Sequence, residues 1–351
     1  LVRPSYVLGG RGMMIAYDAE HLRDYMAEAA RISPDYPVYL DRFLEGAIES
    51  DVDALCDGEE VYIGGILEHI EEAGIHSGDS ATCIPPFSFS ESLQAKLRET
   101  TRRIAMALGV RGLVNVQYAI KGETVYVIEA NPRASRTVPF ISKATGVPLA
   151  KCAARIMAGD SIASLGLPSD ERQLDWFCMK EAVMPWGRFP GADVILGPEM
   201  KSTGEAIGYD DKLTRALYKA LQASGMKVAN YGTVLLTIAD KDKEEVLPLA
   251  RRFYNLGFNI EATSGTADFL RRHGLRTRLR RKLCEGSSEI IDSLRQGHVS
   301  YIINTIDLDQ HNTRFDGYEI RRTAVENNVT LFTSLETVKV LLDVLEEITF
   351  G

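Results

Sequence analysis

The spacing of apolar residues along the chain changes in character near residue 226. Before that point, short runs rich in Val, Ile and Tyr predict strands, and apolar side chains at helical spacing predict amphipathic helices. We expect strands over 38–40, 47–55, 60–67, 113–120 and 124–130, and helices over 18–32, 90–108, 148–158 and 211–223. Strands and helices interleaved around a mainly antiparallel sheet indicate an α+β domain. Prolines and glycines weaken the pattern from about residue 159, which we interpret as a connecting segment.

After residue 226 the pattern alternates regularly between strand and helix. Strands are expected over 233–239, 259–262, 300–304 and 330–332, and helices over 243–256, 267–273, 288–296, 320–327 and 335–347. Alternation of this length predicts a parallel, doubly wound sheet, the α/β class. The sequence therefore predicts two domains, 1–225 and 226–351.

The composition narrows the functional classes. Of 351 residues, 45% are apolar and 25% charged, and the net charge of -9 argues against a nucleic-acid-binding surface. The five cysteines are scattered without a C-x-x-C pair, which favours reduced thiols over a disulfide frame or a zinc site. Neither a membrane-spanning apolar run nor a signal peptide is visible. We therefore expect a cytoplasmic protein with no nucleic-acid or membrane partner.

Polar side chains converge at the predicted hairpin of 113–120 and 124–130. Glu129 and Asn131 are two residues apart and so project from the same face of their strand, and Gln117 of the partner strand can lie beside them. One carboxylate and two amide oxygens are hard ligands suited to Mg²⁺, which also takes ligands from nucleotide phosphates. Arg133 and Arg136 follow at once and would face an anionic substrate. A Glu-x-Asn at a strand end is common, so this motif alone is weak.

Two glycine-containing turns are candidate anion sites. Residues 3–12 read as a strand entering a glycine-rich turn whose backbone N–H groups could close over phosphates, although it is neither a Walker A loop nor a GxGxxG motif. Residues 262–266 (ATSGT) join a predicted strand to a helix, where free N–H groups and hydroxyls attract phosphate. Lys243 and Lys282 are the cations we assign to that second turn, with Asn304 at the end of the next strand. Hydroxyls at a helix start can also serve simply as caps.

Four motifs carry a resemblance to a known family. They are residues 2–11 (VRPSYVLGGR), 75–81 (IHSGDSA), 131–140 (NPRASRTVPF) and 142–150 (SKATGVPLA). Together they resemble the ATP-grasp ligases and, more closely, the second, C-terminal synthetase half of the carbamoyl-phosphate synthase large subunit. The resemblance runs from Leu1 to about Gly351, and residues 226–351 look like the methylglyoxal-synthase-like regulatory domain that ends that subunit. Because the chain starts inside a strand-like motif, we expect a partial ATP-grasp domain that lacks its N-terminal part.

The resemblance implies an activity and its cofactors. A carbamoyl-phosphate synthase of this kind phosphorylates carbamate with ATP to give carbamoyl phosphate for arginine and pyrimidine biosynthesis. It implies ATP and Mg²⁺ or Mn²⁺ as cofactors, and a K⁺ site near His69 and Glu49. The implied partners are a glutamine-hydrolysing small subunit, the N-terminal remainder of the large subunit and further copies of the whole complex.

The resemblance also implies roles for individual residues. Arg133 and Arg136 would orient carbamate, and Gln117, Glu129 and Asn131 would hold the metal. The implied ATP-binding residues are Arg3, Gly9, Gly10, Arg42, Leu44, Glu49, Gly74, Ile75, His76, Ser77, Gln117 and Glu129. Position 42 is Arg where relatives carry His, which puts that nucleotide contact in doubt.

Two regulatory sites are implied in the same way. A nucleotide effector such as UMP or IMP would bind Lys243, Thr263, Gly265, Thr266, Lys282 and Asn304. Ile306 replaces a hydroxyl residue of the relatives, so the identity of the effector stays open. Glu71, Asp79 and Glu181 resemble the acidic residues that bind the activator ornithine.

Two other interpretations remain. The chain could be another ATP-grasp ligase, such as a biotin carboxylase or a carboxylating enzyme of the purine pathway, although those carry different C-terminal modules. It could also act only as an effector-binding regulatory module without turnover.

Overall fold

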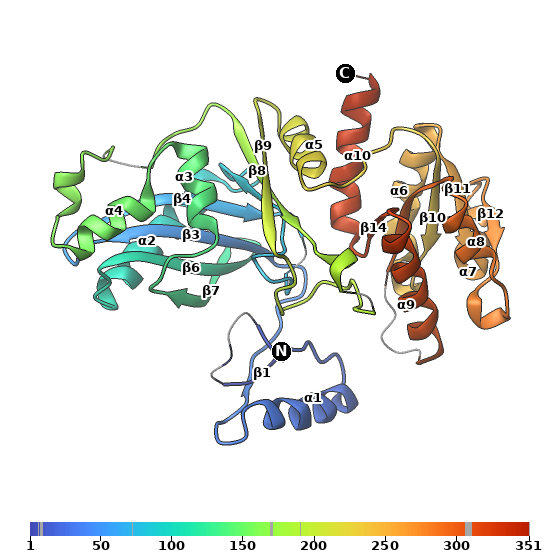
Figure 1. Cartoon of the computed structure of the whole chain (residues 1–351), viewed down its shortest axis with the longest axis horizontal. Helices are drawn as coiled ribbons and strands as arrows, with labels where there is room; N and C mark the ends of the chain where they lie inside the picture. The colour runs from blue at the N-terminus through green and yellow to red at the C-terminus, as the bar shows by residue number, and fades with distance from the viewer. Residues whose placement is uncertain are drawn as a thin grey trace. The chain divides into compact units, whose positions relative to one another are not determined.

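The computed structural model describes residues 1–5, 7, 10–71, 73–168, 171–189, 191–305 and 311–350, and within 311–315 only the backbone. Its contacts divide the chain into two compact units (Figure 1). The first contains Leu1–Val183 and Leu196–Ala220, and the second contains Met184–Ile195 and Leu221–Gly351. The segment 184–195 thus belongs to the second unit although its neighbours on both sides belong to the first. The predicted boundary at residue 225 stays a prediction.

The first unit is built on a seven-stranded antiparallel sheet, which confirms the predicted α+β class. The strand order is β7-β6-β3-β4-β5-β8-β9. The strands are β3 (Ile48–Cys56), β4 (Val61–His69), β5 (Thr82–Ile84), β6 (Gly112–Lys121), β7 (Thr124–Asn131), β8 (Phe177–Val183) and β9 (Gly204–Asp210). A separate antiparallel pair joins β1 (Val2–Arg3) to β2 (Tyr39–Leu40).

Helices cover both faces of this sheet (Figure 1). On one face, α2 (Glu91–Ala107) buries Leu93 and Leu97 against Val52 and neighbouring apolar side chains. On the other, α3 (Thr137–Thr145) and α4 (Leu149–Met157) pack against Leu55. Because side chains alternate along β3, the odd-numbered residues 49, 51 and 53 share the α3 and α4 face with Leu55.

Other helices of this unit begin and end close to their predicted positions. α1 (Ala19–Ile32) starts after Asp18, whose carboxylate accepts hydrogen bonds from the backbone N–H groups of Glu20 and His21, as expected of an N-cap. α5 (Leu213–Ala223) follows β9. The strands β5, β8 and β9 and the helix α3 were not predicted. The sequence did not predict β8 because the charged residues Lys180 and Glu181, which are buried, interrupt its apolar pattern.

The second unit has a five-stranded, fully parallel sheet, which confirms the doubly wound α/β class. Its order is β12-β11-β10-β13-β14. The strands are β10 (Thr233–Thr237), β11 (Asn259–Thr263), β12 (Arg278–Arg280), β13 (Val299–Asn304) and β14 (Thr330–Phe332), and the helices α6 (Lys243–Asn255), α7 (Ser264–Arg272), α8 (Glu289–Arg295), α9 (His311–Glu326) and α10 (Leu335–Phe350). The order reverses at β10, so right-handed crossovers place α6 and α7 on one face and α8 and α9 on the other.

Candidate functional site

The β6–β7 hairpin brings the three predicted metal ligands together. Gln117 lies directly opposite Glu129, and Asn115 lies opposite Asn131. The Asn131 side-chain amide donates to Glu129 Oε1 at 2.7 Å, and Gln117 Nε2 donates to Ser77 Oγ at 3.0 Å. The pairing shifts register between Gln117 and Tyr118, so Ile128 is an extra residue on β7. Such bulges re-aim side chains, here those at the end of β7.

The donor set of this hairpin fits a hard divalent cation. It combines the exposed carboxylate of Glu129 with the amide oxygens of two partly exposed side chains. In the part of the chain that the structure describes, no group of three or more His, Cys, Asp or Glu is arranged to hold a metal. The hairpin suits Mg²⁺, which completes its coordination with phosphate oxygens and water.

A buried polar network lies next to the hairpin on the α3 and α4 face of β3. His69 Nε2 and Asp51 Oδ2 are 2.7 Å apart, and Asn115 Nδ2 donates to Asp51 Oδ1 at 3.1 Å. Burial alone would raise the pKa of Asp51, but His69, the hydrogen bond from Asn115 and the charge of Lys180 together outweigh it and leave that pKa below its ordinary value. The network therefore keeps a carboxylate ionised beneath the candidate metal ligands.

Asp53 is held differently in the same network. Its carboxylate accepts hydrogen bonds from Ser135 Oγ, at 2.6 Å, and from Thr137 Oγ1, which anchors the segment that carries Arg133 and Arg136. Burial raises the pKa of Asp53 to about 6 despite these bonds. The sequence reasoning missed Asp51 and Asp53. The available signal was acidic residues at alternate positions of an otherwise apolar strand.

Glu49 and the loop 74–77 form the next part of the site. Glu49 Oε1 accepts a hydrogen bond from Gly74 N at 2.9 Å, and Glu49 Oε2 lies 3.9 Å from His69 Nδ1. Burial raises the pKa of Glu49. At Gly74, φ is +98° and an added Cβ would come within 3.0 Å of Phe43, so glycine is required there. The predicted neighbours Glu49, His69 and Gly74 thus do lie together.

His76 in this loop serves as a structural contact. Its backbone N–H donates to Gly197 O at 2.8 Å, and its Nδ1 accepts a hydrogen bond from Gly78 N at 3.0 Å. Burial lowers the pKa of His76, which favours the neutral imidazole that can accept such a bond. Ile75 precedes it and is partly buried.

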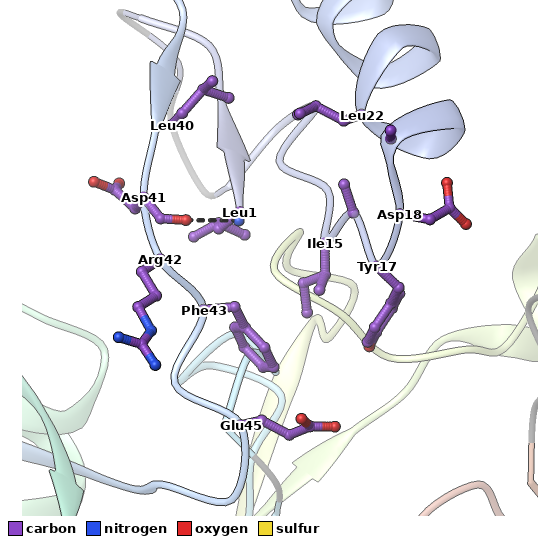
Figure 2. Close-up of a pocket in the computed structure, with 12 residues that line it drawn as sticks. Leu1, Ile15, Tyr17, Asp18, Leu22, Leu40, Asp41, Arg42, Phe43 and Glu45 are labelled. Carbon is purple, nitrogen blue, oxygen red and sulfur yellow. Dashed lines mark hydrogen bonds between the residues drawn. The ribbon is translucent and has the colours of Figure 1, made fainter. Parts of the chain in front are cut away.

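Arg42 lines a cavity of about 560 Å³ beside α1 and the β1–β2 pair. Figure 2 shows Phe43, Tyr17 and Ile15 around this space, whereas the side chain of Arg42 points away from them. Leu44 follows Phe43 but is not among the lining residues described for this cavity. Aromatic side chains around an apolar space are suited to a base ring, and here they provide it without the Arg42 guanidinium.

The glycine-rich turn near the N-terminus is described only in part. The guanidinium of Arg3 lies 5.7 Å from the centre of the Tyr39 ring, and Arg3 Nε is 3.7 Å from Asp41 Oδ2. Gly10 has φ of +72°, and an added Cβ would meet the backbone oxygen of Pro198 at 1.8 Å. Gly9 lies outside the described residues.

The two candidate catalytic arginines differ in their anchoring. Arg136 Nη1 donates to Met200 Sδ at 2.7 Å and is 3.4 Å from Ser202 Oγ. Arg133 Nη1 donates to Ala134 O at 3.3 Å. Arg136 is thus positioned by a loop, whereas the exposed Arg133 contacts its own neighbour.

Two of the three predicted ornithine ligands, Glu71 and Glu181, are buried and lie close enough for their charges to interact. Glu71 Oε2 accepts hydrogen bonds from Ser80 Oγ at 2.7 Å and Ala81 N at 2.5 Å. Burial and the nearby Glu71 raise the pKa of Glu181. Asp79 differs, because its two oxygens accept the backbone N–H groups of Lys201 and Ser202 at 2.7 and 2.8 Å.

The buried acid Glu181 should make stability depend on pH. Its pKa is raised in the folded state, so its contribution to stability is present below its unfolded pKa and is lost as the pH rises through the raised value. We expect the free energy of unfolding to fall between pH 5 and 8 with a slope of up to about 1.4 kcal/mol per pH unit from this group. In Glu181→Gln that slope should flatten, as urea unfolding would measure. Glu99→Gln, on the exposed side of α2, should keep the parent's slope, and an unchanged slope in Glu181→Gln would contradict the prediction.

The second unit gathers the predicted anion-binding residues at the carboxyl ends of its strands. Lys243 Nζ is 2.5 Å from Asp240 Oδ1, and it lies 3.1 Å from the position of a Cβ added to Gly265. Lys243, and the charge of Lys282, lower the pKa of Asp240. Lys282 N donates to Glu285 Oε2 at 3.2 Å, and Ser264 Oγ at the start of α7 donates to Glu285 Oε1 at 3.1 Å, so both lysine residues lie near the start of α7.

The hydroxyls at the start of α7 are not used as caps. Thr263 is the N-cap residue, but its side chain makes no capping hydrogen bond within the described residues. Thr266 Oγ1 instead accepts from Ile238 N at 3.3 Å. The first N–H groups of α7 are therefore not satisfied by a Thr263 side-chain cap, which leaves the helix start suited to an anion.

Asn304 ends β13 opposite Thr237, where the strand order reverses. Its amide donates to Thr237 Oγ1 at 2.9 Å and accepts from Arg321 Nη1 at 2.7 Å. Arg321 also makes two bonds to the carboxylate of Asp193, in the segment 184–195. Ile306 lies outside the described residues.

Comparisons with known proteins give matches for both units, and these matches point to the same family. Residues 1–165 match the family described as carbamoyl-phosphate synthase L chain, ATP binding domain, and residues 245–333 match the MGS-like domain. The carbamoyl phosphate synthase large chain of Archaeoglobus fulgidus is 53% identical over 336 residues, covering 95% of this chain and 31% of that protein. The C-terminal section of the large chain of Aquifex aeolicus is 46% identical over 366 residues, covering 99% of this chain and 67% of that protein. The chain thus spans about a third of the full-length relatives.

Solved structures agree on the fold. Biotin carboxylase of Campylobacter jejuni, in complex with a β,γ-ATP compound, has a TM-score of 0.50 at 16% identity and covers 63% of this chain and 56% of that one. The biotin carboxylase domain of Hydrogenobacter thermophilus 2-oxoglutarate carboxylase, with MgADP and bicarbonate, also has a TM-score of 0.50 at 16% identity, covering 63% and 55%. At this identity the likeness concerns the fold alone. No helix of the described residues is long and apolar enough to cross a membrane.

Proposed function

Because this chain belongs to the carbamoyl phosphate synthase large-chain family, we propose that its first unit carries the site that phosphorylates carbamate with ATP. The products would be carbamoyl phosphate and ADP. The observation that carries the proposal is the cross-strand grouping of Gln117, Glu129 and Asn131, with Arg136 anchored in the segment that follows. Metal ligands beside a guanidinium group are what phosphoryl transfer between two anions requires.

Each residue then has a physical role. Gln117, Glu129 and Asn131 would hold Mg²⁺ or Mn²⁺, which when bound would neutralise charge on the phosphates. Arg133 and Arg136 would orient carbamate, and Arg3 with Gly9 and Gly10 would contact the phosphates. Glu49 would accept the ribose hydroxyls. Arg42, Leu44, Gly74, Ile75, His76 and Ser77 would surround the rest of the nucleotide.

The buried network supports this assignment through geometry. Asp53 ties down Ser135 and Thr137 on either side of Arg136, and Asp51 holds Asn115 beside the hairpin. These contacts would keep the cations and the metal ligands in place before substrate arrives, which is the condition for electrostatic stabilisation of a transition state. A K⁺ site near His69 and Glu49 is part of the same proposal.

The second unit is proposed as a sensor for a phosphorylated nucleotide such as UMP or IMP. Its support is the convergence of Lys243, Lys282 and the start of α7. Thr263, Gly265 and Thr266 would contact the phosphate. The side-chain amide of Asn304 already hydrogen-bonds to Thr237 and Arg321, so Asn304 would support the effector site by holding the end of β13 in place.

Lys243→Met should weaken UMP or IMP binding about ten- to hundredfold, because a charge-assisted contact to phosphate contributes about 1.5–3 kcal/mol. Calorimetry on the chain would measure this. Lys241→Met is the matched control, since Lys241 is an exposed lysine of the same loop. Equal affinities for the parent and Lys243→Met would rule out this phosphate site.

Ornithine would bind at the acidic pocket of Glu71 and Glu181, with Asp79 shaping the pocket through the backbone of 201–202. The proposed partners are the remainder of the large chain, a glutamine-hydrolysing small subunit and further copies of that complex. We propose a cytoplasmic setting for it.

The test measures whether this chain forms ATP from carbamoyl phosphate and ADP in the presence of Mg²⁺. ATP formation would establish the phosphoryl-transfer site in this chain. Its absence, with UMP or IMP still bound, would favour the second candidate function, a regulatory module without turnover. The convergence at α7 is the observation that favours that candidate.

A further inference from the structure

Lys180 is a buried lysine whose ammonium group makes one hydrogen bond within the part of the chain that the structure describes. It lies in β8, is 2% exposed and donates through Nζ to the backbone oxygen of Ser77 at 3.0 Å. Removing an ammonium group from water costs several kcal/mol unless charges compensate it. Burial lowers the pKa of Lys180, and the charges of Glu205, Asp51, Glu71 and Glu181 act in the opposite direction.

Ser77 connects this lysine to the candidate metal site. While its backbone oxygen accepts from Lys180, its Oγ accepts from Gln117 Nε2 at 3.0 Å. Gln117 in turn lies opposite Glu129. The contacts therefore run from β8 through the loop to the β6–β7 hairpin.

The sheet alone cannot make that connection. β6 and β8 are separated by β3, β4 and β5, so four inter-strand steps divide them. At about 4.8 Å per step, β6 and β8 are roughly 19 Å apart in the sheet, which is farther than a lysine side chain can reach. Ser77 of the loop 74–80 bridges the two strands, because it contacts both Lys180 of β8 and Gln117 of β6.

We propose that Lys180 is a positioning residue that holds the Ser77 carbonyl and so sets the place of Gln117 in the metal and nucleotide site. This inference rests on the proposed function. The loop has further anchors, because Asp79 holds 201–202 and Ser202 Oγ donates to Gly78 O at 3.0 Å. Those anchors fix its far end, whereas Lys180 acts on the residue that contacts Gln117.

The alternative explanation is that Lys180 only balances the negative charge of the surrounding carboxylates and does not position the loop. Lysine and arginine differ here, because a guanidinium is planar and cannot present one compact ammonium to the same carbonyl oxygen. A neutralising role would survive Lys180→Arg. A positioning role would not, since it depends on where the donor lies.

The experiment compares Lys180→Met and Lys180→Arg with the parent chain by two measurements. Hydrogen–deuterium exchange reports the protection of amides 74–80, and calorimetry reports the affinity for Mg·ADP. We expect both variants to exchange faster at 74–80 and to bind Mg·ADP about 10- to 100-fold more weakly, the usual effect of losing an outer-shell partner. Lys96→Met is the matched control, because Lys96 is an exposed lysine that also donates to a backbone carbonyl, that of Glu123 at 3.3 Å. It should match the parent in both measurements.

The outcomes separate the inference from the proposed function. If the parent binds Mg·ADP and Lys180→Arg matches it in affinity and in exchange at 74–80, the positioning role is overturned. If the parent itself binds no Mg·ADP, the proposed function fails, and the exchange comparison still decides whether Lys180 fixes the loop. Should Lys180→Met not fold, Lys180→Arg alone carries the test.

Discussion

Glu129→Gln should slow ATP formation from carbamoyl phosphate and ADP by about two to three orders of magnitude. Glu129 is the one carboxylate among the three proposed metal ligands. Glutamine keeps the shape of the side chain and an oxygen that can accept the Asn131 bond, but it removes the negative charge. The lower rate would therefore reflect a weaker electrostatic attraction between residue 129 and the metal rather than a change of fold. The assay uses the chain alone, or the chain joined to the remainder of a large chain if turnover requires it.

The control for this variant is Glu123→Gln. Glu123 lies in the turn of the same hairpin, is exposed and is not part of the metal set. It should keep the parent's rate. A raised Mg²⁺ requirement in Glu129→Gln with an unchanged melting temperature would complete the expected result. A rate within twofold of the parent at all Mg²⁺ concentrations would remove Glu129 from the metal site.

Gly208→Ala should cost the first unit about 3 kcal/mol of stability. Gly208 is buried in β9, and an added Cβ would lie 2.1 Å from the backbone oxygen of Ala216 and 2.4 Å from the backbone nitrogen of Ala220. Both atoms belong to α5, so relief requires the helix to move away from the strand. A loss of this size lowers the melting temperature by about 6 to 12 °C in a unit of some 200 residues.

Gly204→Ala is the matched control, because it makes the same substitution in the same strand at a position where an added Cβ has space. There the nearest atom to an added Cβ is Val183 Cβ at 3.6 Å, an ordinary contact. Its effect should stay within about 1 kcal/mol. Thermal unfolding of the two variants measures the difference, and equal melting temperatures would show that α5 does not pack on β9 at this distance.

Much of the candidate site was predictable because its signals are local. Glu129 and Asn131 share a face through the two-residue period of a strand, and a two-residue turn brings Gln117 opposite Glu129. The turn 262–266 likewise joins a strand to a helix within five residues. In both places short-range geometry alone dictates which groups meet.

Other parts of the site were not predictable, because their signals are long-range. Glu181 was a candidate ornithine ligand by resemblance, but no local pattern predicts that Lys180 and Glu181 are both buried. Asp51, Asp53 and His69 form their network only after β3, β4 and β6 have paired. Arg136 is held by Met200 and Ser202, more than 60 residues away in sequence.

The amino-acid sequence alone was sufficient for the two fold classes and for the candidate metal ligands of the β6–β7 hairpin and the candidate anion site at α7. Periodicity and turn chemistry act over a few residues, so they can be read along the chain. The burial of Lys180, its contact with Ser77 and the approach of α5 to Gly208 depend on which distant segments pack together. They became visible only in the folded chain, because burial and charge pairing arise from packing that no local pattern records.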